Sequence, residues 1–151
     1  MISIKYLIIL ISLILFMSKE FTLKIKIYYE DTDAGGVVYY ANYLKFMERA
    51  RSEAIYSMGL SNKTIFEDYK ILLIVKSCNI QYIKSAKLED ELKIITSIKS
   101  ISKTSFIMKQ ITKRFEELIA DAEVHLVSVN KDGKPTKIPE VLENNLKKYI
   151  F

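Results

Sequence analysis

The chain has 151 residues, the length of one domain with a single hydrophobic core. It contains one histidine and one cysteine, so a zinc site of Cys and His ligands and a Cys–His nucleophile pair have almost no residues to use. None of its four glycines stands in a dinucleotide or P-loop motif. The net charge of +5 comes from interspersed basic and acidic residues, with no basic tract interleaved with aromatics. We therefore expect no nucleic-acid partner, no metal and no cofactor.

Residues 1–16 form an apolar N-terminal segment with 13 apolar residues, one lysine and no acid. The uncharged stretch 6–16 is shorter than the roughly 20 residues that a spanning helix needs. Lys5 before an apolar run is typical of a signal peptide, but no small-residue cleavage site follows. Three interpretations stay open: a mis-assigned start before Met17, a weak membrane anchor, or a signal. We expect residues 17–151 to form a single domain.

The first half of this domain changes its hydrophobic period once. Residues 22–29 alternate between apolar and polar side chains and predict a half-buried strand. A turn-rich loop follows over 30–36. From about Tyr40 to Met58 the apolar residues recur at helical spacing, and Gly59 is placed to end the helix. Residues 61–69 predict a short helical or irregular piece.

The second half is rich in strands. Strand-like runs cover 71–82, 91–101, 105–115 and 118–129, and the last three are joined by short connections that favour antiparallel neighbours. A tight turn is predicted at 131–134, and Pro139 begins a terminal helix whose apolar side we expect to carry Val141, Leu142 and Leu146. The order predicts an α+β fold, in which an antiparallel sheet of about five strands wraps around one long helix.

The loop before the long helix carries the most chemistry. Three acids fall within Glu30–Asp33, and Gly35 and Gly36 allow a sharp turn and a close approach to a ligand. The N-terminus of the helix presents unpaired N–H groups and a partial positive charge, which suit a developing oxyanion. An acid facing such a site can act as a base or a nucleophile in acyl transfer.

Two structural interpretations compete with this one. The spacing of Asp31, Asp33 and the glycines is typical of the start of a calcium loop, but the twelfth position is Asn42 and the bidentate glutamate is missing. Alternatively, Asp31 or Asp33 caps the helix, which requires no function.

The string YYEDTDAGGVVYYANYLKFMERAR, residues 28–51, resembles the signature of hotdog-fold acyl-CoA thioesterases. The similar families are the Tol-Pal-associated and the 4-hydroxybenzoyl-CoA thioesterases. The resemblance extends over 21–145 and includes residues 75–82, the start of the strand at Lys103 and the Asp132-Gly133 turn. It implies a hotdog fold and hydrolysis of an acyl-CoA thioester to a free acid and CoA.

The resemblance also implies a site. Asp33 matches the catalytic carboxylate, a nucleophile or a general base on water, and Tyr40 matches the position whose backbone N–H polarises the thioester carbonyl. Tol-Pal-associated members usually carry histidine at that position, so a step that uses imidazole is not expected here. Gly35, Gly36 and Val37 are the candidate substrate-binding residues of the loop.

Two further substrate-binding residues follow from the same resemblance. Glu48 stands at a position that is acidic in these families and is a candidate for the acyl pocket, or else an exposed acid beside Arg51 or Ser52. Lys103 matches a basic position that meets the CoA phosphates at a subunit interface, with Lys76 and Lys84 as weaker candidates.

The remaining expectations concern the whole protein. We expect His125 to be a surface residue, Cys78 to be buried among apolar residues, and the chain to form a cytoplasmic homodimer or homotetramer, with peripheral membrane association possible. A hotdog dehydratase or hydratase ranks lower because the long helix has no histidine. The main alternative is a non-hydrolytic module that binds acyl thioesters or a membrane partner.

Overall fold

The computed structural model describes residue 4 and residues 20–151, and the expectations for 1–16 lie, apart from Ile4, outside this part. In chain order the elements are β1 (Phe21–Lys26), the 3-10 turn η1 (Tyr29–Asp31), α2 (Asn42–Ser57), α3 (Asn62–Tyr69), β2 (Ile71–Tyr82), β3 (Glu91–Ile101), β4 (Ser105–Arg114), β5 (Glu117–Asn130), α4 (Glu140–Leu146) and the 3-10 turn η2 (Lys147–Tyr149).

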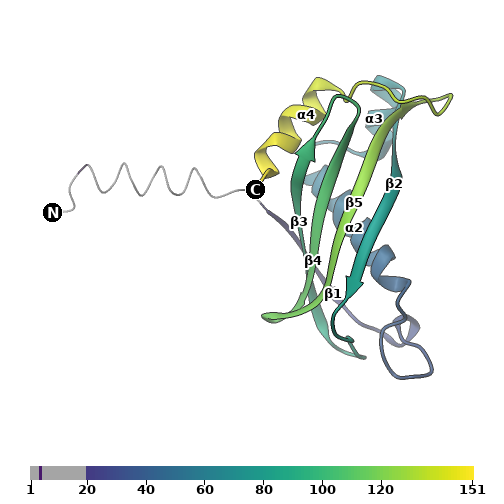
Figure 1. The fold of residues 1–151 in the computed structure, drawn as a ribbon, viewed down its shortest axis with the longest axis vertical. Helices are drawn as coiled ribbons and strands as arrows, with labels where there is room; N and C mark the ends of the chain where they lie inside the picture. Colours follow the sequence, from purple (N-terminus) through teal and green to yellow (C-terminus); the bar gives the residue numbers. More distant parts are fainter. Residues whose placement is uncertain (1–3, 5–19) are drawn as a thin grey trace.

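The five strands form one sheet in the order β1-β3-β4-β5-β2, and all neighbouring pairs are antiparallel. Helix α2 crosses one face of this curved sheet (Figure 1). The predicted α+β arrangement of a five-stranded antiparallel sheet around one long helix is confirmed. β1 and β2 are the two edges, and β2 is twice as long as β1, with 12 residues against 6.

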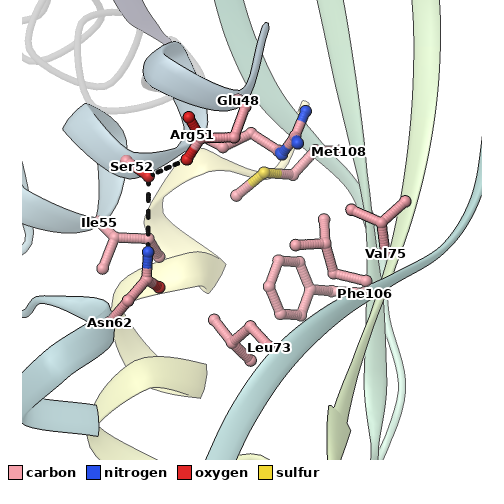
Figure 2. Close-up of a pocket in the computed structure, with 10 residues that line it drawn as sticks. Glu48, Arg51, Ser52, Ile55, Asn62, Leu73, Val75, Phe106 and Met108 are labelled. Atoms are coloured by element: carbon pink, nitrogen blue, oxygen red, sulfur yellow. Dashed lines mark hydrogen bonds between the residues drawn. The ribbon is translucent and has the colours of Figure 1, made fainter. Parts of the chain in front are cut away.

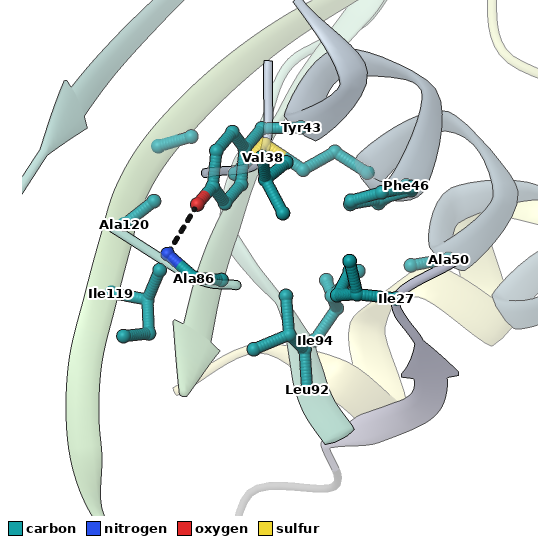
Figure 3. Packing of buried hydrophobic residues seen from close by; sticks show 12 residues of the cluster. Ile27, Val38, Tyr43, Phe46, Ala50, Ala86, Leu92, Ile94, Ile119 and Ala120 are labelled. Carbon is teal, nitrogen blue, oxygen red and sulfur yellow. Dashed lines mark hydrogen bonds between the residues drawn. The ribbon is translucent and has the colours of Figure 1, made fainter. Parts of the chain in front are cut away.

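The apolar stripe of α2 supplies the centre of the core. Phe46, Met47 and Ala50 are fully buried and pack with Ile27 and Leu92 in a cluster near the first half of the helix (Figure 3). A second cluster lies toward α4 and includes Ile55. Spacings of three and four residues place these side chains on one face of the helix, which is why the period predicted it.

Helix α2 ends at a glycine, and helix α4 buries one apolar side. Gly59 has φ +76°, a conformation that favours glycine, and its amide bonds to the carbonyl of Tyr56 at 2.9 Å, so α2 ends where the sequence predicted. In α4, Leu142 and Leu146 are buried as predicted. Val141 is 38% exposed, so its predicted place on the apolar side was wrong.

Two other expectations are corrected by the packing. The first strand stops at Lys26 because residues 29–31 turn into η1, where the Asp31 carboxylate accepts a hydrogen bond from the Tyr28 amide at 2.9 Å. Cys78 is exposed, and the prediction that it is buried was wrong. Its strand β2 is an edge, and among the residues that the structure describes α2 packs mainly against β1 and β3, whereas α3 contacts β2.

Candidate active site

The loop before α2 is a tight turn built around Asp33. The Asp33 amide bonds to the carbonyl of Val37 at 2.9 Å, and the Gly36 amide bonds back to the Asp33 carbonyl at 3.0 Å. Gly36 has φ +74°, which explains a glycine at this position. The Asp33 carboxylate folds over the turn and accepts a hydrogen bond from the Gly35 amide at 2.7 Å. A Cβ atom on residue 35 would lie 3.0 Å from that same carboxylate oxygen, so the turn and the carboxylate position depend on each other.

Backbone hydrogen bonds fix this loop against its neighbours. The Val38 amide bonds to the Ala86 carbonyl at 2.8 Å, and the Tyr39 amide bonds to the Asp31 carbonyl at 2.9 Å. The side chain of Asn42 donates to the same Asp31 carbonyl at 3.0 Å. Asn42, the twelfth residue counted from Asp31, therefore makes a structural hydrogen bond at the position where a calcium loop would carry its glutamate.

The N-terminus of α2 has no side-chain cap, and its N-cap residue is Ala41. Neither Asp31 nor Asp33 caps it: Asp31 caps η1, and Asp33 bonds within its own turn. Within residues 20–151 the Tyr40 amide donates no hydrogen bond. Tyr40 lies in the turn just before α2, and its carbonyl accepts a hydrogen bond from the Tyr82 hydroxyl at 3.1 Å. The helix end thus offers N–H groups with partial positive charge.

Asp33 and Tyr40 border one hollow of about 250 Å³. Its wall is lined by residues from the acidic loop, the first turn of α2, the end of β2 and the segment after it: Asp33, Val37, Val38, Tyr40, Tyr43, Tyr82, Ile83, Lys84 and Ser85. The Tyr82 ring stands edge-on to both Tyr40 and Tyr43, with ring centroids 6.1 and 5.5 Å away. The structure therefore brings Asp33, Val37 and Tyr40 together, as predicted from the sequence.

Two tyrosines of this hollow, Tyr43 and Tyr82, have raised pKa values. Burial raises the pKa of Tyr43, whose hydroxyl oxygen accepts a hydrogen bond from the Ala86 amide at 3.2 Å (Figure 3). Burial likewise raises the pKa of Tyr82. A hydrogen bond with Tyr40 raises the pKa of Tyr39. Besides its tyrosines, the ionisable side chains that line the hollow are Asp33 and Lys84.

Residues 28–146 match the model of the thioesterase-like superfamily. The chain belongs to this superfamily. It is 35% identical over 125 residues to the "Acyl-CoA thioesterase YbgC" of Haemophilus influenzae, covering 82% of this chain and 92% of that protein. It is 37% identical over 118 residues to the "Acyl-CoA thioester hydrolase YbgC" of Escherichia coli O157:H7, covering 77% and 87%.

A solved structure agrees with these sequence relationships. The probable thioesterase from Bartonella henselae superposes with a TM-score of 0.77 at 30% sequence identity, over 80% of this chain and all of that one. The hotdog fold expected from the residue 28–51 string is thereby confirmed for this member of the thioesterase-like superfamily.

An ion-pair network supports one wall of the hollow beside Asp33. The Lys84 ammonium lies 2.6 Å from Glu117, and Arg114 contacts both Glu117 and Asp90, at 2.5 and 2.6 Å. Hydrogen bonds from Lys84 and Arg114 lower the pKa of Glu117. The Asp90 carboxylate also accepts from the Lys87 amide at 2.8 Å, so the network braces the segment that carries Ser85 and Ala86.

Glu48 and Lys103 lie apart from this hollow. Glu48 lines a second hollow further along α2, and its carboxylate accepts a hydrogen bond from Ser52 at 2.7 Å (Figure 2). Lys103 lies in the turn between β3 and β4, at the end of the sheet near α4, whereas the acidic loop lies at the opposite end (Figure 1). On β5, Tyr82 pairs with Ala120 and Ser105 pairs with Val127. These two positions of β5 are seven residues apart, which corresponds to about 23 Å along the strand.

His125 lies away from the hollow beside Asp33. His125 is half-buried on the outer face of β5, in phase with Asp121 and Glu123 as predicted, and lines a shallow hollow away from Asp33. Among the residues that the structure describes, no group of three or more His, Cys, Asp and Glu side chains could hold a metal ion. In the same part of the chain, no helix has the length and hydropathy needed to span a membrane.

Sequence reasoning missed Tyr82 and Tyr43 as residues of the site. The sequence places Tyr82 only at the end of the strand-like run 71–82, and Tyr43 only within the helical run from Tyr40 to Met58. The available signal was that Tyr43 stands at the start of the long helix and Tyr82 at the end of a strand, so both can lie beside the acidic loop. Lys84, a weaker candidate from the sequence, is the basic residue that the fold places in the hollow with Asp33.

Proposed function

We propose that this protein is an acyl-CoA thioester hydrolase that converts an acyl-CoA and water into a free acid and CoA. The observation that carries the proposal is that Asp33 and Tyr40, which lies just before the uncapped N-terminus of α2, line the same hollow. Two relatives with 35% and 37% identity are named for this activity. The proposal places the enzyme in the cytoplasm, where acyl-CoA thioesters are made and used.

In the proposed mechanism the thioester carbonyl oxygen accepts a hydrogen bond from the Tyr40 amide. Asp33 takes a proton from a water molecule while the water oxygen attacks the carbonyl carbon, and the negative charge moves to the carbonyl oxygen. The helix N-terminus stabilises this oxyanion. The intermediate collapses, the C–S bond breaks, and the proton on Asp33 passes to the departing CoA thiolate. Direct attack by Asp33, which gives a mixed anhydride that water then hydrolyses, is the alternative route.

The proposed role of Tyr40 rests on its backbone. Its side chain is 60% exposed and packs edge-on against Tyr39 and Tyr82, so it occupies the rim of the hollow. The amide is available whatever the side chain is, and therefore the exchange of histidine for tyrosine keeps the oxyanion donor. Gly35, Gly36 and Val37 form the turn that lets the thioester approach Asp33 closely.

We further propose that the enzyme is at least a homodimer that pairs through β2. Within residues 20–151 this strand bonds to β5 on one side only, and three large side chains along it, Leu72, Ile74 and Val75, are between 42% and 49% exposed. A long apolar edge strand with unpaired backbone groups is a template for pairing with another strand. Lys103, which is distant from Asp33 within one chain, meets the CoA phosphates in this proposal from a neighbouring subunit.

Thiol release from a panel of acyl-CoAs tests the activity. The purified protein is mixed with straight-chain and aromatic acyl-CoAs, and free CoA thiol is measured with a chromogenic disulfide. Turnover of at least one acyl-CoA is expected. Binding of acyl-CoAs without any thiol release would instead identify a non-hydrolytic binding module.

A further inference from the structure

A second hollow of about 120 Å³ lies beside α2, about two turns beyond the acidic loop. One side is apolar and contains Leu73, Phe106 and Met108, and the other is polar and contains Glu48, Arg51 and Ser52 (Figure 2). An engineered cavity of about 150 Å³ accepts a benzene molecule, so this hollow is large enough for the end group of a ligand.

Arg51 is held in one orientation at the polar side. Its Nη1 donates to the side-chain oxygen of Gln110 at 2.9 Å. Gln110 is fully buried, and its amide nitrogen donates to the Met47 carbonyl and the Thr96 hydroxyl, both at 3.0 Å. The two bonds donated by the amide nitrogen fix the Gln110 side chain, and the Gln110 oxygen then fixes the guanidinium. A binding group that is locked by a second layer of hydrogen bonds is typical of a preorganised site.

Most of the hydrogen-bonding capacity of Arg51 is unused. A guanidinium has five N–H donors, and within residues 20–151 the side chain of Arg51 donates only the one bond to Gln110. In the same part of the chain no carboxylate lies within 4 Å of it, although the group is half-buried. Burial lowers the pKa of Arg51, and the nearby Glu48 raises it. A half-buried donor of this kind is stabilised by a ligand that accepts its hydrogen bonds.

Glu48 supplies a hydrogen-bond acceptor beside the donors of Arg51. One of its carboxylate oxygens accepts from Ser52 at 2.7 Å, and the other accepts no hydrogen bond within residues 20–151. The hollow therefore presents donors from Arg51 and an acceptor from Glu48. A hydroxyl group both accepts and donates, so it satisfies both side chains. A ligand carboxylate would be repelled by Glu48, and a methyl group would leave Arg51 without its acceptor.

The two hollows lie along one seam between α2 and β2. Tyr43 and Tyr82 line the first hollow, and Arg51 and Val75 line the second. Tyr43 and Arg51 are eight residues apart on α2, which corresponds to about 12 Å along the helix. An acyl chain whose thioester lies beside Asp33 and which follows α2 reaches the second hollow with its distal end.

We propose that Arg51 and Glu48 bind a hydroxyl group at the distal end of the acyl chain, so that the enzyme selects medium-chain acyl-CoAs with a terminal hydroxyl over unsubstituted chains of equal length. The inference rests on the proposed thioesterase function, because it assigns the acyl end of that same site. Arg51 is the specificity-determining residue, and Gln110 is the residue that positions it.

The test compares kcat/KM for alkanoyl-CoAs and ω-hydroxyalkanoyl-CoAs over a series of chain lengths. For at least one length the wild type is expected to prefer the hydroxylated substrate by about 10-fold or more, the effect of a hydrogen bond to a charged group. Arg51→Met should remove this preference by slowing the hydroxylated substrate alone. Arg51→Lys keeps the charge without the planar fork and should keep part of the preference. Arg49→Met, an exposed arginine of α2 outside the hollow, is the matched control and should retain it.

Two results would overturn the inference: no preference in the wild type at any chain length, or an equal loss on both substrate types in Arg51→Met. Thermal unfolding identifies a variant that fails to fold, in which case Arg51→Lys decides. If no substrate is hydrolysed, the proposed function fails instead. The ratio of Kd values for the same two ligands, measured by calorimetry with the wild type and Arg51→Lys, still decides the inference.

Discussion

The carboxylate of Asp33 accepts a hydrogen bond from the backbone amide of Gly35, with 2.7 Å between Oδ1 and N. Within residues 20–151 the other oxygen of Asp33 accepts no hydrogen bond, so it is available to a water molecule or a thioester carbon. The contact combines two sequence features, an acid and a glycine two residues later, in one geometric unit.

Gly35→Ala should reduce activity more than stability. The added Cβ would lie 3.0 Å from Asp33 Oδ1 and push the carboxylate aside, and a misplacement of about 1 Å can reduce a rate by about 100-fold. We expect kcat to fall by about 10-fold or more in steady-state assays, with a small change in Tm. Gly133→Ala is the control: Gly133 has φ +75° in a distant turn, so alanine there should cost about 1 kcal/mol of stability and leave kcat unchanged. Equal kcat in Gly35→Ala and wild type would contradict the role of this contact.

Tyr82→Phe should loosen the turn that holds the proposed oxyanion donor. The change keeps the ring packing against Tyr40 and Tyr43 but removes the 3.1 Å hydrogen bond to the Tyr40 carbonyl. We expect a loss of about 0.5–1.5 kcal/mol in unfolding free energy and a lower kcat with little change in KM. Tyr69→Phe, exposed at the end of α3, should change neither. A change in KM alone would show that Tyr82 acts in binding instead.

The long helix, the strands of the sheet and the meeting of Asp33 with Tyr40 were predictable because they depend on local periods and short separations. Glu48 and Ser52 form the contact that their helical spacing allows. Arg51 was weighed only as a neighbour of Glu48, yet its hydrogen bond is to Gln110, 59 residues further along the chain. These two side chains meet only because α2 lies over β4 in the folded protein. No local sequence pattern shows which strand lies under the helix.

The environments of Cys78 and Lys103 likewise depend on the arrangement of the strands, which local sequence patterns do not contain. Strict alternation places Cys78 on one face of β2 with Ile74, Ile80 and Tyr82, but the irregularity between Val75 and Ser77 puts Ile74 on the other face. Burial of Cys78 further depends on whether another element covers its face, and β2 is an edge. Lys103 is identified by resemblance, but its distance from Asp33 follows from the strand order and the register.

The ion pairs beside Lys84 predict a pH-dependent stability. Lys84 and Arg114 lower the pKa of Glu117, so the stabilisation is present above the ordinary glutamate pKa and is lost as pH falls through the lower pKa of the folded protein. Glu117→Gln should therefore be less stable than wild type in urea unfolding at neutral pH, and the difference should shrink toward zero at about pH 3. Glu116→Gln, whose side chain is 90% exposed, is the control and should show little difference at either pH. A difference that grows on acidification would contradict the assigned sign.

The proposed β2 interface can be measured through Cys78. It is the single cysteine of the chain and is exposed near the middle of β2, so one spin label per chain reports on this edge. If a twofold axis passes through the middle of the strand, the two labelled backbones are offset by three residues, about 10 Å. Light scattering should give a dimer or tetramer, and dipolar spectroscopy should give a short distance. A monomer, or a multimer without a short label distance, would contradict pairing through β2.

The most direct test of the central claim is thiol release by Asp33→Asn beside Glu30→Gln, a variant of an exposed acid in the same loop. The acyl-CoA that wild type hydrolyses best is supplied at saturating concentration, and calorimetry measures binding of the same compound. We expect Asp33→Asn to bind it with a Kd close to that of wild type and to lose at least about 100-fold in kcat, as expected for a general base, while Glu30→Gln keeps the wild-type rate. Normal turnover by Asp33→Asn would contradict the assignment of Asp33 as the catalytic carboxylate.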